Sequence, residues 1–327
     1  MLASTTSRIS VALCTYNGEH FLPQQLESIR GQTRLPDEVV ICDDGSSDRT
    51  LDIVYKFTEV AQFPVKIIRN DTTLGSSRNF EQAVRLCSGD LIALSDQDDI
   101  WYPNRLERSE QALASDPRAG LVFSDADIID DEGRLTGETL WQRLRFIGKP
   151  KQDLLDHNFV ILAKQRFVTG ATVMFRADLR DRFLPMQDGW IHDEWIALIS
   201  AAFCDLKPID QPLIRYRIHS LQQVGLKNKL EQRVPKKTRA ERHWARLEES
   251  VRELQQMCDT LSTMERDDHR GVLPAYHRHL KFLAFRSSLS VNRLGRLGPI
   301  LKKYAQYQIH ASGLASAVKD LVLPRQE

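Results

Sequence analysis

A cluster of carboxylates has the clearest chemistry in this sequence. Three aspartates, Asp96, Asp98 and Asp99, follow the apolar run Leu91–Leu94. The run predicts a buried strand, and an extended continuation would place Asp96 and Asp98 on one side. Carboxylates this close repel one another, so we expect a cation between them, either Mg²⁺ or Mn²⁺ carrying substrate phosphates. The alternative is an acidic turn in which an aspartate caps the helix that begins near Asn104.

Two more polar clusters stand where predicted strands end. The runs Ile9–Cys14 and Val39–Cys42 are followed by Thr15, Tyr16 and Asn17 and by Asp43 and Asp44, respectively. With a further strand at Val65–Arg69 and amphipathic helices between the strands, the pattern predicts an α/β fold with a doubly wound, mostly parallel sheet. Ligands of such sheets bind beyond the carboxyl ends of the strands, so the three clusters should line one crevice.

The segment that follows has less regular strands. We expect a strand at Gly120–Phe123 that ends in the acidic stretch Ser124–Asp127, and another strand at Thr169–Phe175. An apolar helix should run through Phe203. The segment Pro212–His219 then predicts an extended chain that is rich in positive groups.

Three residues of this segment have chemistry to offer. Asp193 precedes the apolar helix, where it could be the N-cap of a helix that begins near Trp195. Arg217 and His219 share a face of the extended segment, so the pair could neutralise a phosphate. The alternative for His219 is a structural role.

Composition excludes several classes of protein. With 42% hydrophobic and 27% charged residues among 327, the chain is typical of a soluble globular protein. We find no apolar run long enough to span a membrane, and no apolar core of a secretory signal at the N-terminus. The cysteines are scattered without a Cys-x-x-Cys pair, so we expect small core residues in a reducing cytosol. They are Cys14, Cys42, Cys87, Cys204 and Cys258.

Charge divides the chain into two regions. Residues 227–327 hold 20 Lys/Arg against 11 Asp/Glu, whereas residues 1–226 hold 25 against 33. We expect a catalytic domain at 1–225 and a basic helical region at 226–327, with helices near 242–264, 273–289 and 300–323. The basic helices predict peripheral attachment to an anionic membrane on its cytoplasmic face. The alternative is a solvated helical domain used for packing or self-association. We do not expect nucleic-acid binding, because the basic region contains neither an aromatic stacking pattern nor a zinc motif.

Taken in order, four motifs resemble the inverting family-2 glycosyltransferases of the GT-A fold. They are Cys14-Thr15-Tyr16-Asn17-Gly18, Asp43-Asp44-Gly45-Ser46-Ser47-Asp48, Asp96-Gln97-Asp98-Asp99 and His192-Asp193, and the resemblance covers roughly residues 8–225. The resemblance implies a nucleoside diphosphate sugar as donor and a hydroxyl acceptor, such as a glycan or lipid-linked glycan. His192-Asp193 with Trp195, followed by the segment from Pro212 to Gly225, is most similar to the rhamnosyltransferase branch.

The resemblance also implies a role for individual residues. Tyr16 corresponds to a residue that packs against the nucleobase of the donor, and Asp44 to one that forms a hydrogen bond with the nucleobase. Asp193 corresponds to the general base that takes the proton of the acceptor. The metal is held by Asp96 and Asp98. The expected donor-binding residues are Thr15, Tyr16, Asn17, Asp43, Asp44, Asp96, Arg217 and His219.

Two other functions fit part of the pattern. A nucleotidyltransferase also places acidic residues beside a nucleotide, but it needs a basic phosphate loop, and Thr15–Phe21 contains neither Lys nor Arg. A non-catalytic scaffold of the same fold would be expected to have lost Asp98 or Asp193, and both are present.

Overall fold

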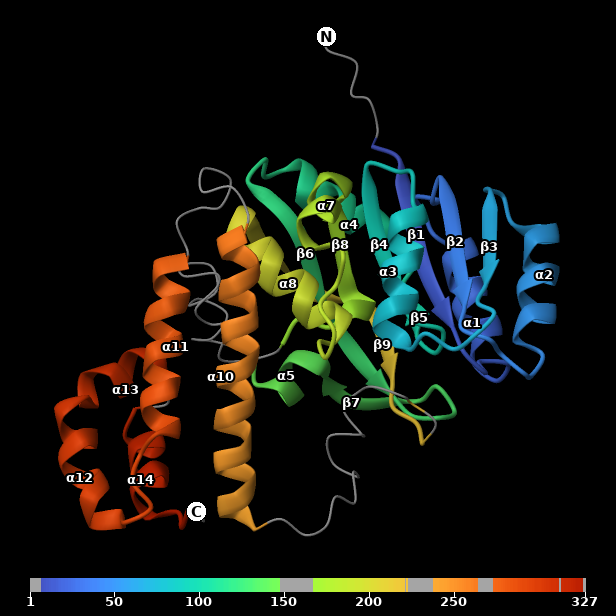
Figure 1. The fold of residues 1–327 in the computed structure, drawn as a ribbon. Coiled ribbons are helices and arrows are strands. Elements are labelled where there is room, and N and C mark those ends of the chain that lie inside the picture. Colours follow the sequence, from blue (N-terminus) through green and yellow to red (C-terminus); the bar gives the residue numbers. More distant parts are fainter. Residues whose placement is uncertain are drawn as a thin grey trace. The chain divides into compact units, whose positions relative to one another are not determined.

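The structure, a computed structural model, describes residues 7–147, 167–220, 222, 238–263, 273–311 and 313–325. The chain divides into two compact units (Figure 1). The first comprises Met1–Asn158 and Arg166–Lys227, and the second comprises Phe159–Gln165 and Asn228–Glu327. The predicted boundary between residues 225 and 226 lies outside the described residues. Within the described part, no helix is both long and apolar enough to cross a membrane.

Four parallel strands form one half of the sheet in the first unit. They are β1 (Ile9–Thr15), β2 (Glu38–Asp43), β3 (Val65–Arg69) and β4 (Leu91–Ser95), in the order β3-β2-β1-β4. Nearly all side chains of β1, β2 and β4 are buried, because helices cover both faces of the sheet. These strands therefore read as continuous apolar runs rather than as alternating patterns.

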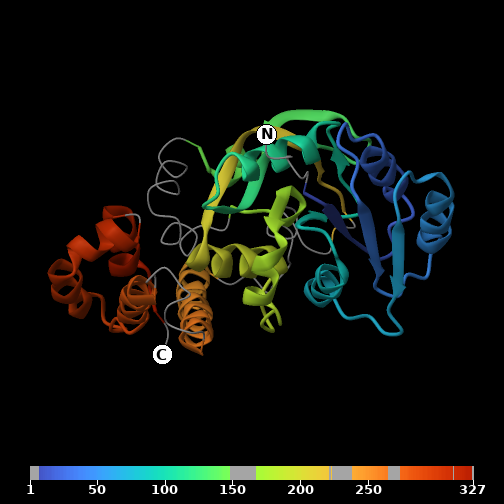
Figure 2. The same ribbon diagram turned by 90° about the horizontal axis from the view of Figure 1, so that it is seen from above.

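The connecting helices are amphipathic. They are α1 (Leu22–Arg30), α2 (Thr50–Val60) and α3 (Ser76–Leu86). In α1, for example, Leu22, Leu26 and Ile29 are buried at helical spacing, so one side of the helix packs on the sheet. Figure 2 shows α1 and α3 on opposite faces of the parallel strands. The predicted doubly wound arrangement is confirmed.

The other half of the sheet is mainly antiparallel. Its strands are β5 (Ile100–Trp101), β6 (Ala119–Ile129), β7 (Leu135–Thr139), β8 (Val173–Arg176) and β9 (Asp205–Arg217). β8 pairs antiparallel with both β4 and β6, and β6 pairs parallel with β9. β5 and β7 add antiparallel pairs to β9 and β6, respectively. The helices here are α4 (Arg105–Ala114), α5 (Leu140–Leu144), α7 (Arg180–Phe183) and α8 (His192–Phe203), with 3₁₀ turns η1 (Gly170–Thr172) and η2 (Ala177–Leu179).

Two predicted strand boundaries in this half were wrong. The strand expected to end at Phe123 continues as β6 to Ile129, because the stretch Ser124–Asp127 is not a turn. Buried residues alternate there with half-buried aspartates, which is the pattern of a strand with one covered face. The strand expected from Thr169 begins only at Val173, because a 3₁₀ turn precedes it.

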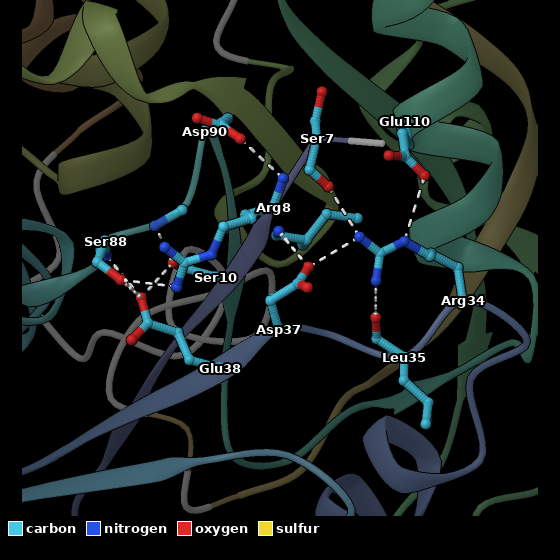
Figure 3. A network of polar contacts seen from close by, with 12 residues as sticks. Ser7, Arg8, Ser10, Arg34, Leu35, Asp37, Glu38, Ser88, Asp90 and Glu110 are labelled. Atoms are coloured by element: carbon cyan, nitrogen blue, oxygen red, sulfur yellow. Dashed lines mark hydrogen bonds and ion pairs between the residues drawn. The ribbon is translucent and has the colours of Figure 1, made fainter. Parts of the chain in front are cut away.

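A polar network holds the amino ends of the parallel strands (Figure 3). The backbone N–H of Arg8 donates to Asp90 Oδ2, and that of Ile9 donates to Asp37 Oδ2, each at 2.8 Å. Glu38 accepts a further bond from the Ser88 hydroxyl at 2.9 Å. Carboxylates at the starts of β2 and β4 thus hold the start of β1 between them, which helps to fix the register of the three strands.

The second unit is helical in the described residues. It contains α10 (Arg239–Thr263), α11 (Leu273–Ser287), α12 (Arg293–Lys302), α13 (Tyr304–His310) and α14 (Leu314–Val322). The first two predicted helices are confirmed, but the single helix expected at 300–323 was wrong. The chain turns at Lys303 and again at Gly313, whose φ of +54° is readily adopted by glycine. All five cysteines of the two units are buried and free, which confirms them as small core residues.

A buried carboxylate joins the helices of the second unit. Asp320 of α14 is fully buried and accepts two hydrogen bonds from the Arg286 guanidinium, at 2.7 and 2.9 Å. It also accepts one from the Tyr307 hydroxyl at 2.6 Å and contacts His243 Nε2 at 2.8 Å. Burial alone would raise the pKa of Asp320, but these partners hold it below its ordinary value.

Replacing this carboxylate should loosen the helical unit. We expect Asp320→Asn to destabilise it by about 3–5 kcal/mol, because Arg286 would remain buried without a counter-charge. Since the folded-state pKa is depressed, the stabilisation is present at neutral pH and is lost as the pH falls through that pKa. The difference between wild type and variant in hydrogen exchange of α14 should therefore shrink in acid. The exposed Asp259→Asn is the control, and equal effects of both substitutions would contradict the assignment.

Candidate active site

The ends of β1, β2 and β4 bring the three predicted clusters together. Thr15 and Asp43 are paired residues at the carboxyl ends of β1 and β2. Ser95, the last residue of β4, pairs with Leu13 of β1. The polar residues that follow these strands therefore meet along one edge of the sheet, opposite the network of Figure 3.

Asp43 and Asn17 build the turn that follows β2. The buried Asp43 carboxylate accepts hydrogen bonds from the Thr15 hydroxyl and the Ser46 backbone N–H, both at 2.9 Å. Asn17 has a φ of +45°, and its side-chain oxygen accepts the Ser47 N–H at 2.8 Å. Asp43 and Thr15 thus satisfy each other inside the protein, whereas Asn17 is exposed beside them.

Asp44 organises the loop before α3. It is buried, and its carboxylate accepts the backbone N–H groups of Leu74 at 2.7 Å and Gly75 at 2.9 Å. A third bond comes from Asn70 Nδ2 at 2.9 Å. The carboxylate therefore already has three protein donors, which sequence reasoning did not foresee because the donors are mostly backbone groups.

Gln97 connects the first cluster to the acidic one. Its side-chain oxygen accepts the Tyr16 N–H at 2.8 Å, and its amide nitrogen donates to the Tyr16 carbonyl at 3.0 Å. Gly18 leaves the space for this side chain, because a Cβ there would lie 2.2 Å from Gln97 Oε1. The side chain of Tyr16 remains half-buried at the site.

The acidic cluster carries more negative charge than its surroundings offset. Burial, together with the carboxylates of Asp98 and Asp193, raises the pKa of Asp96 to about 8. Burial, together with the carboxylates of Asp98 and Asp96, raises the pKa of Asp99 well above its usual range. The buried Arg105 interacts with both Asp96 and Asp99, and burial lowers its own pKa to about 9. An additional cation at this cluster would relieve the repulsion.

Arg217 has a different position from the predicted one. Four of its five N–H groups donate to protein acceptors: Asp98 O at 2.8 Å, Asp130 O at 3.1 Å, Asp131 O at 3.0 Å and Gln24 Oε1 at 2.6 Å. The side chain is buried. Its guanidinium therefore holds the acidic loop in place, which argues against the expected direct contact with a diphosphate.

His219 lies at the acidic loop. Its Nε2 is 2.8 Å from Asp98 Oδ2, and its ring packs against Phe21 with the centroids 4.4 Å apart. Adjacent ligands of one octahedral cation are separated by about 3 Å. The imidazole nitrogen and the Asp98 carboxylate could therefore ligate the same ion, a role for His219 that sequence reasoning missed.

The residues present fit a cation that arrives with phosphate oxygens. Asp96 supplies an under-compensated carboxylate, and Asp98 and His219 supply two adjacent ligand atoms. The described part of the chain contains no compact group of three or more His, Cys, Asp or Glu side chains that could hold a metal ion by itself. A diphosphate would have to complete the coordination, which is the usual arrangement for Mg²⁺.

Asp193 lies at the second residue of α8. The helix begins at His192, with Ile191 at the N-cap position. The alternative that Asp193 is the N-cap of a helix that begins near Trp195 was therefore wrong. The carboxylate accepts the Gly170 N–H at 2.9 Å and the Glu194 N–H at 2.7 Å. Because β8 pairs antiparallel with β4, the turn that contains Gly170 lies at the carboxyl end of β4, and Asp193 therefore lies beside the acidic cluster although it is about a hundred residues away in sequence.

His192 and Gly170 pack closely beside Asp193. The His192 ring is buried and stacks on Phe80 with the centroids 4.0 Å apart, and neither ring nitrogen has a hydrogen-bond partner in the described residues. Burial lowers the pKa of His192, so the ring is neutral. A Cβ at Gly170 would lie 2.7 Å from His192 Nε2. A glycine within a predicted strand is the sequence signal that could have indicated this close approach.

The comparison with protein families decides what kind of protein this is. The family described as "Glycosyl transferase family 2" matches residues 10–183, which is more than half of the chain. The chain belongs to this family. The match includes the ends of β1, β2 and β4 that carry the polar clusters.

Two relatives are similar to part of this family-2 glycosyltransferase. An uncharacterized glycosyltransferase of Nostoc sp. is 27% identical over 65% of the chain and 65% of its own length. A UDP-Glc:alpha-D-GlcNAc-diphosphoundecaprenol beta-1,3-glucosyltransferase of Escherichia coli is 34% identical over 38% of the chain and 47% of its own length. The chain thus spans less than two thirds of each of these relatives.

Solved structures support the GT-A type of fold. TarS 1-349 of S. aureus, in complex with UDP-GlcNAc, has a TM-score of 0.56 at 17% identity and covers 96% of this chain and 81% of its own. A mannosyltransferase of Pyrobaculum calidifontis, in complex with GDP-Man and Mn²⁺, has a TM-score of 0.51 at 17% identity, covering 98% and 87%. The predicted fold class is therefore confirmed.

Adding one methyl group at Gly170 should displace Asp193 at the start of α8. The new Cβ would meet His192 Nε2 and approach the Asp193 Cβ to 3.3 Å, so the start of α8 must shift. We expect Gly170→Ala to lower sugar transfer by about 10- to 100-fold while the circular dichroism spectrum is retained. Gly298→Ala is the matched control, because the space around that glycine is open. Wild-type transfer by Gly170→Ala would show that Asp193 needs no exact placement.

Proposed function

We propose that this protein catalyses the inverting transfer of a sugar from a nucleoside diphosphate sugar to a hydroxyl acceptor, assisted by Mg²⁺ or Mn²⁺. The observation that supports this most strongly is the convergence of Asp193 with the Asp96–Asp98 pair at the end of β4, because an acceptor hydroxyl held by Asp193 would lie close to a donor diphosphate held at the acidic loop. Membership of a glycosyltransferase family weighs against the nucleotidyltransferase alternative.

The nucleotide is proposed to bind along the loops after β1 and β2. Tyr16 is half-buried there and Asn17 is exposed, so both side chains have surface to offer to a base and ribose. Thr15 and Asp43 are buried under this surface, where the Thr15 hydroxyl donates a hydrogen bond to the Asp43 carboxylate. Asp44 can take part in base recognition only if the Leu74–Gly75 loop gives up one of its hydrogen bonds.

The diphosphate is proposed to lie against Asp96, Asp98 and His219. A bound divalent cation would neutralise the charge that develops on the leaving diphosphate. The protein's contribution is to hold the ligand atoms. The Arg217 guanidinium donates to the Asp98 carbonyl, and the Asp99 carboxylate accepts the backbone N–H of Arg217 at 3.0 Å. These buried contacts keep the acidic loop in one conformation before the donor arrives.

Asp193 is proposed to remove the proton of the acceptor hydroxyl. As that oxygen attacks the anomeric carbon, the bond to the diphosphate breaks and the proton moves to the carboxylate, so the configuration inverts. Each Asp193 oxygen accepts one backbone N–H, and each keeps a second lone pair for the acceptor. The two N–H bonds fix the carboxylate on the start of α8.

The finer assignments rest on resemblance. Rhamnose is the sugar that the His192-Asp193-x-Trp195 pattern favours, and a screen of dTDP-, UDP- and GDP-sugars for thermal stabilisation tests it. A relative from Escherichia coli is named for a diphosphoundecaprenol acceptor, which supports a lipid-linked glycan as acceptor here. Such an acceptor requires a cytoplasmic protein that works at the membrane surface.

Removing one metal ligand should disable donor binding and transfer together. We expect Asp98→Asn to lower transfer by about a hundredfold or more, because the cation would lose an anionic ligand. Chelator should abolish wild-type transfer, and Mn²⁺ or Mg²⁺ should restore it. Asp71→Asn, which removes an exposed carboxylate, should behave as wild type. Full activity in excess chelator would overturn the metal assignment.

Removing the base should affect turnover without affecting donor affinity. Asp193→Asn cannot take the proton, so turnover should fall by about 10² to 10⁴, while the dissociation constant of the donor stays unchanged. Because asparagine retains only one acceptor oxygen for the two N–H groups, the melting temperature must be measured alongside. Asp188→Asn, nearby and exposed, is the control. A variant that folds normally and keeps its turnover would rule out Asp193 as the base.

A further inference from the structure

Exposed apolar side chains are concentrated in the second unit. Of the 13 large hydrophobic residues that are exposed in the described part, eight lie between Val291 and Val322. Three of these lie on α12 and three on α14. These two helices pack side by side (Figure 1), and we refer to their exposed residues as the α12–α14 surface. A packed protein core does not explain side chains that leave so much of their area in water.

The apolar residues of α12 form a single stripe. Leu294, Leu297 and Leu301 have a spacing of three and four residues, so they lie on one side of the helix, and Leu294 is 84% exposed. The opposite side is fastened to the protein by Arg296, which is fully buried. Its guanidinium donates to the carbonyl of Leu323 at 2.7 Å. The exposed stripe is therefore held on a fixed helix.

The helix α14 repeats this arrangement. Leu314, Val318 and Val322 are spaced by four residues and are exposed, whereas Ala317 and Asp320 on the other side are buried. The same Arg296 guanidinium donates to the Asp320 carbonyl at 2.9 Å, so it joins α12 to α14. Two helices, each with an apolar stripe, thus form one rigid element.

The exposed charge of the segment that carries these stripes has one sign. From Ser288 to Arg325 the sequence contains six Lys and Arg residues and a single acidic residue, Asp320. Asp320 is fully buried in its contacts with Arg286 and Tyr307, so it contributes nothing to the exposed charge. Arg293, Lys302 and Lys319 are exposed. An amphipathic surface of Leu and Val with only basic exposed charges is complementary to anionic lipid headgroups.

We infer that the α12–α14 surface binds an anionic lipid bilayer, with its leucines and valines in the headgroup–acyl boundary and its basic side chains on lipid phosphates. This deepens the proposed attachment to a membrane by naming the residues that make it. It rests on the proposed function only in that a lipid-linked acceptor would give the attachment a purpose.

A second copy of the chain is a poorer partner for this surface. A two-fold interface places the same patch of each copy against the other. The exposed Arg293, Lys302 and Lys319 of one copy would then approach those of its partner, and no exposed acidic residue of 288–325 could compensate them. Like charges brought together at an interface are unfavourable. Anionic lipid supplies the missing opposite charge.

Flotation of the full-length protein with vesicles tests the inference. The vesicles are phosphatidylcholine alone or phosphatidylcholine mixed with phosphatidylglycerol. Wild type should float with the anionic vesicles, and salt should weaken the binding. The double variant Leu294→Ser/Leu301→Ser should bind at least about tenfold more weakly, because two apolar side chains would no longer enter the bilayer. Leu135→Ser, at an exposed leucine of β7, is the matched control and should bind as wild type.

Three results would overturn the inference. They are equal binding to neutral and anionic vesicles, unchanged binding of the double variant, and self-association that the double variant abolishes in the absence of vesicles. Metal-dependent release of nucleotide from a soluble donor is measured on the same samples. The double variant should retain it, so a failure of membrane binding and a failure of the proposed transferase activity are distinguished.

Discussion

The guanidinium of Arg217 joins four segments that are far apart in sequence. It donates to the acidic loop after β4, to the two residues that follow β6, and to Gln24 of α1, while its own backbone belongs to the end of β9. Burial lowers the pKa of Arg217, whereas the neighbouring Asp99 and Asp98 carboxylates favour its charged form. The position of Asp98, and with it that of His219, depends on this one side chain.

That anchoring is needed because the site is electrostatically unfavourable on its own. Burial and the neighbouring carboxylates raise the pKa of Asp96 and of Asp99. Burial, and then the charges of the surrounding aspartates, also raise the pKa of Tyr216 well above its ordinary value. A fold that keeps such charges together without a ligand is destabilised by their repulsion, so rigid contacts are needed to hold them in place. The fixed carboxylates create a strong negative electrostatic potential at the position where a cation and a diphosphate would bind.

How much could be predicted from the sequence depended on the range of the interactions involved. The parallel strands and the meeting of Thr15, Asp43 and Asp96 followed from local apolar runs and the rule for strand ends. The extension of β6 through Asp125 and Asp127 was missed, since polar residues on the open face of a strand look like a turn. The use of Asp44 by backbone N–H groups, and of Arg217 by carbonyls, could not be predicted because backbone donors and acceptors leave no mark in a sequence.

The network at the amino ends of the strands has an evolutionary consequence. Asp37, Glu38 and Asp90 hold β1, β2 and β4 in register at one edge of the sheet, and all the candidate site residues lie beyond the other edge. Loops at the site edge can therefore change in length and composition without unpairing the strands. Because one edge of the sheet fixes the strands and the other carries the site, substitutions in the site loops can change the sugar donor or the acceptor while the protein stays folded.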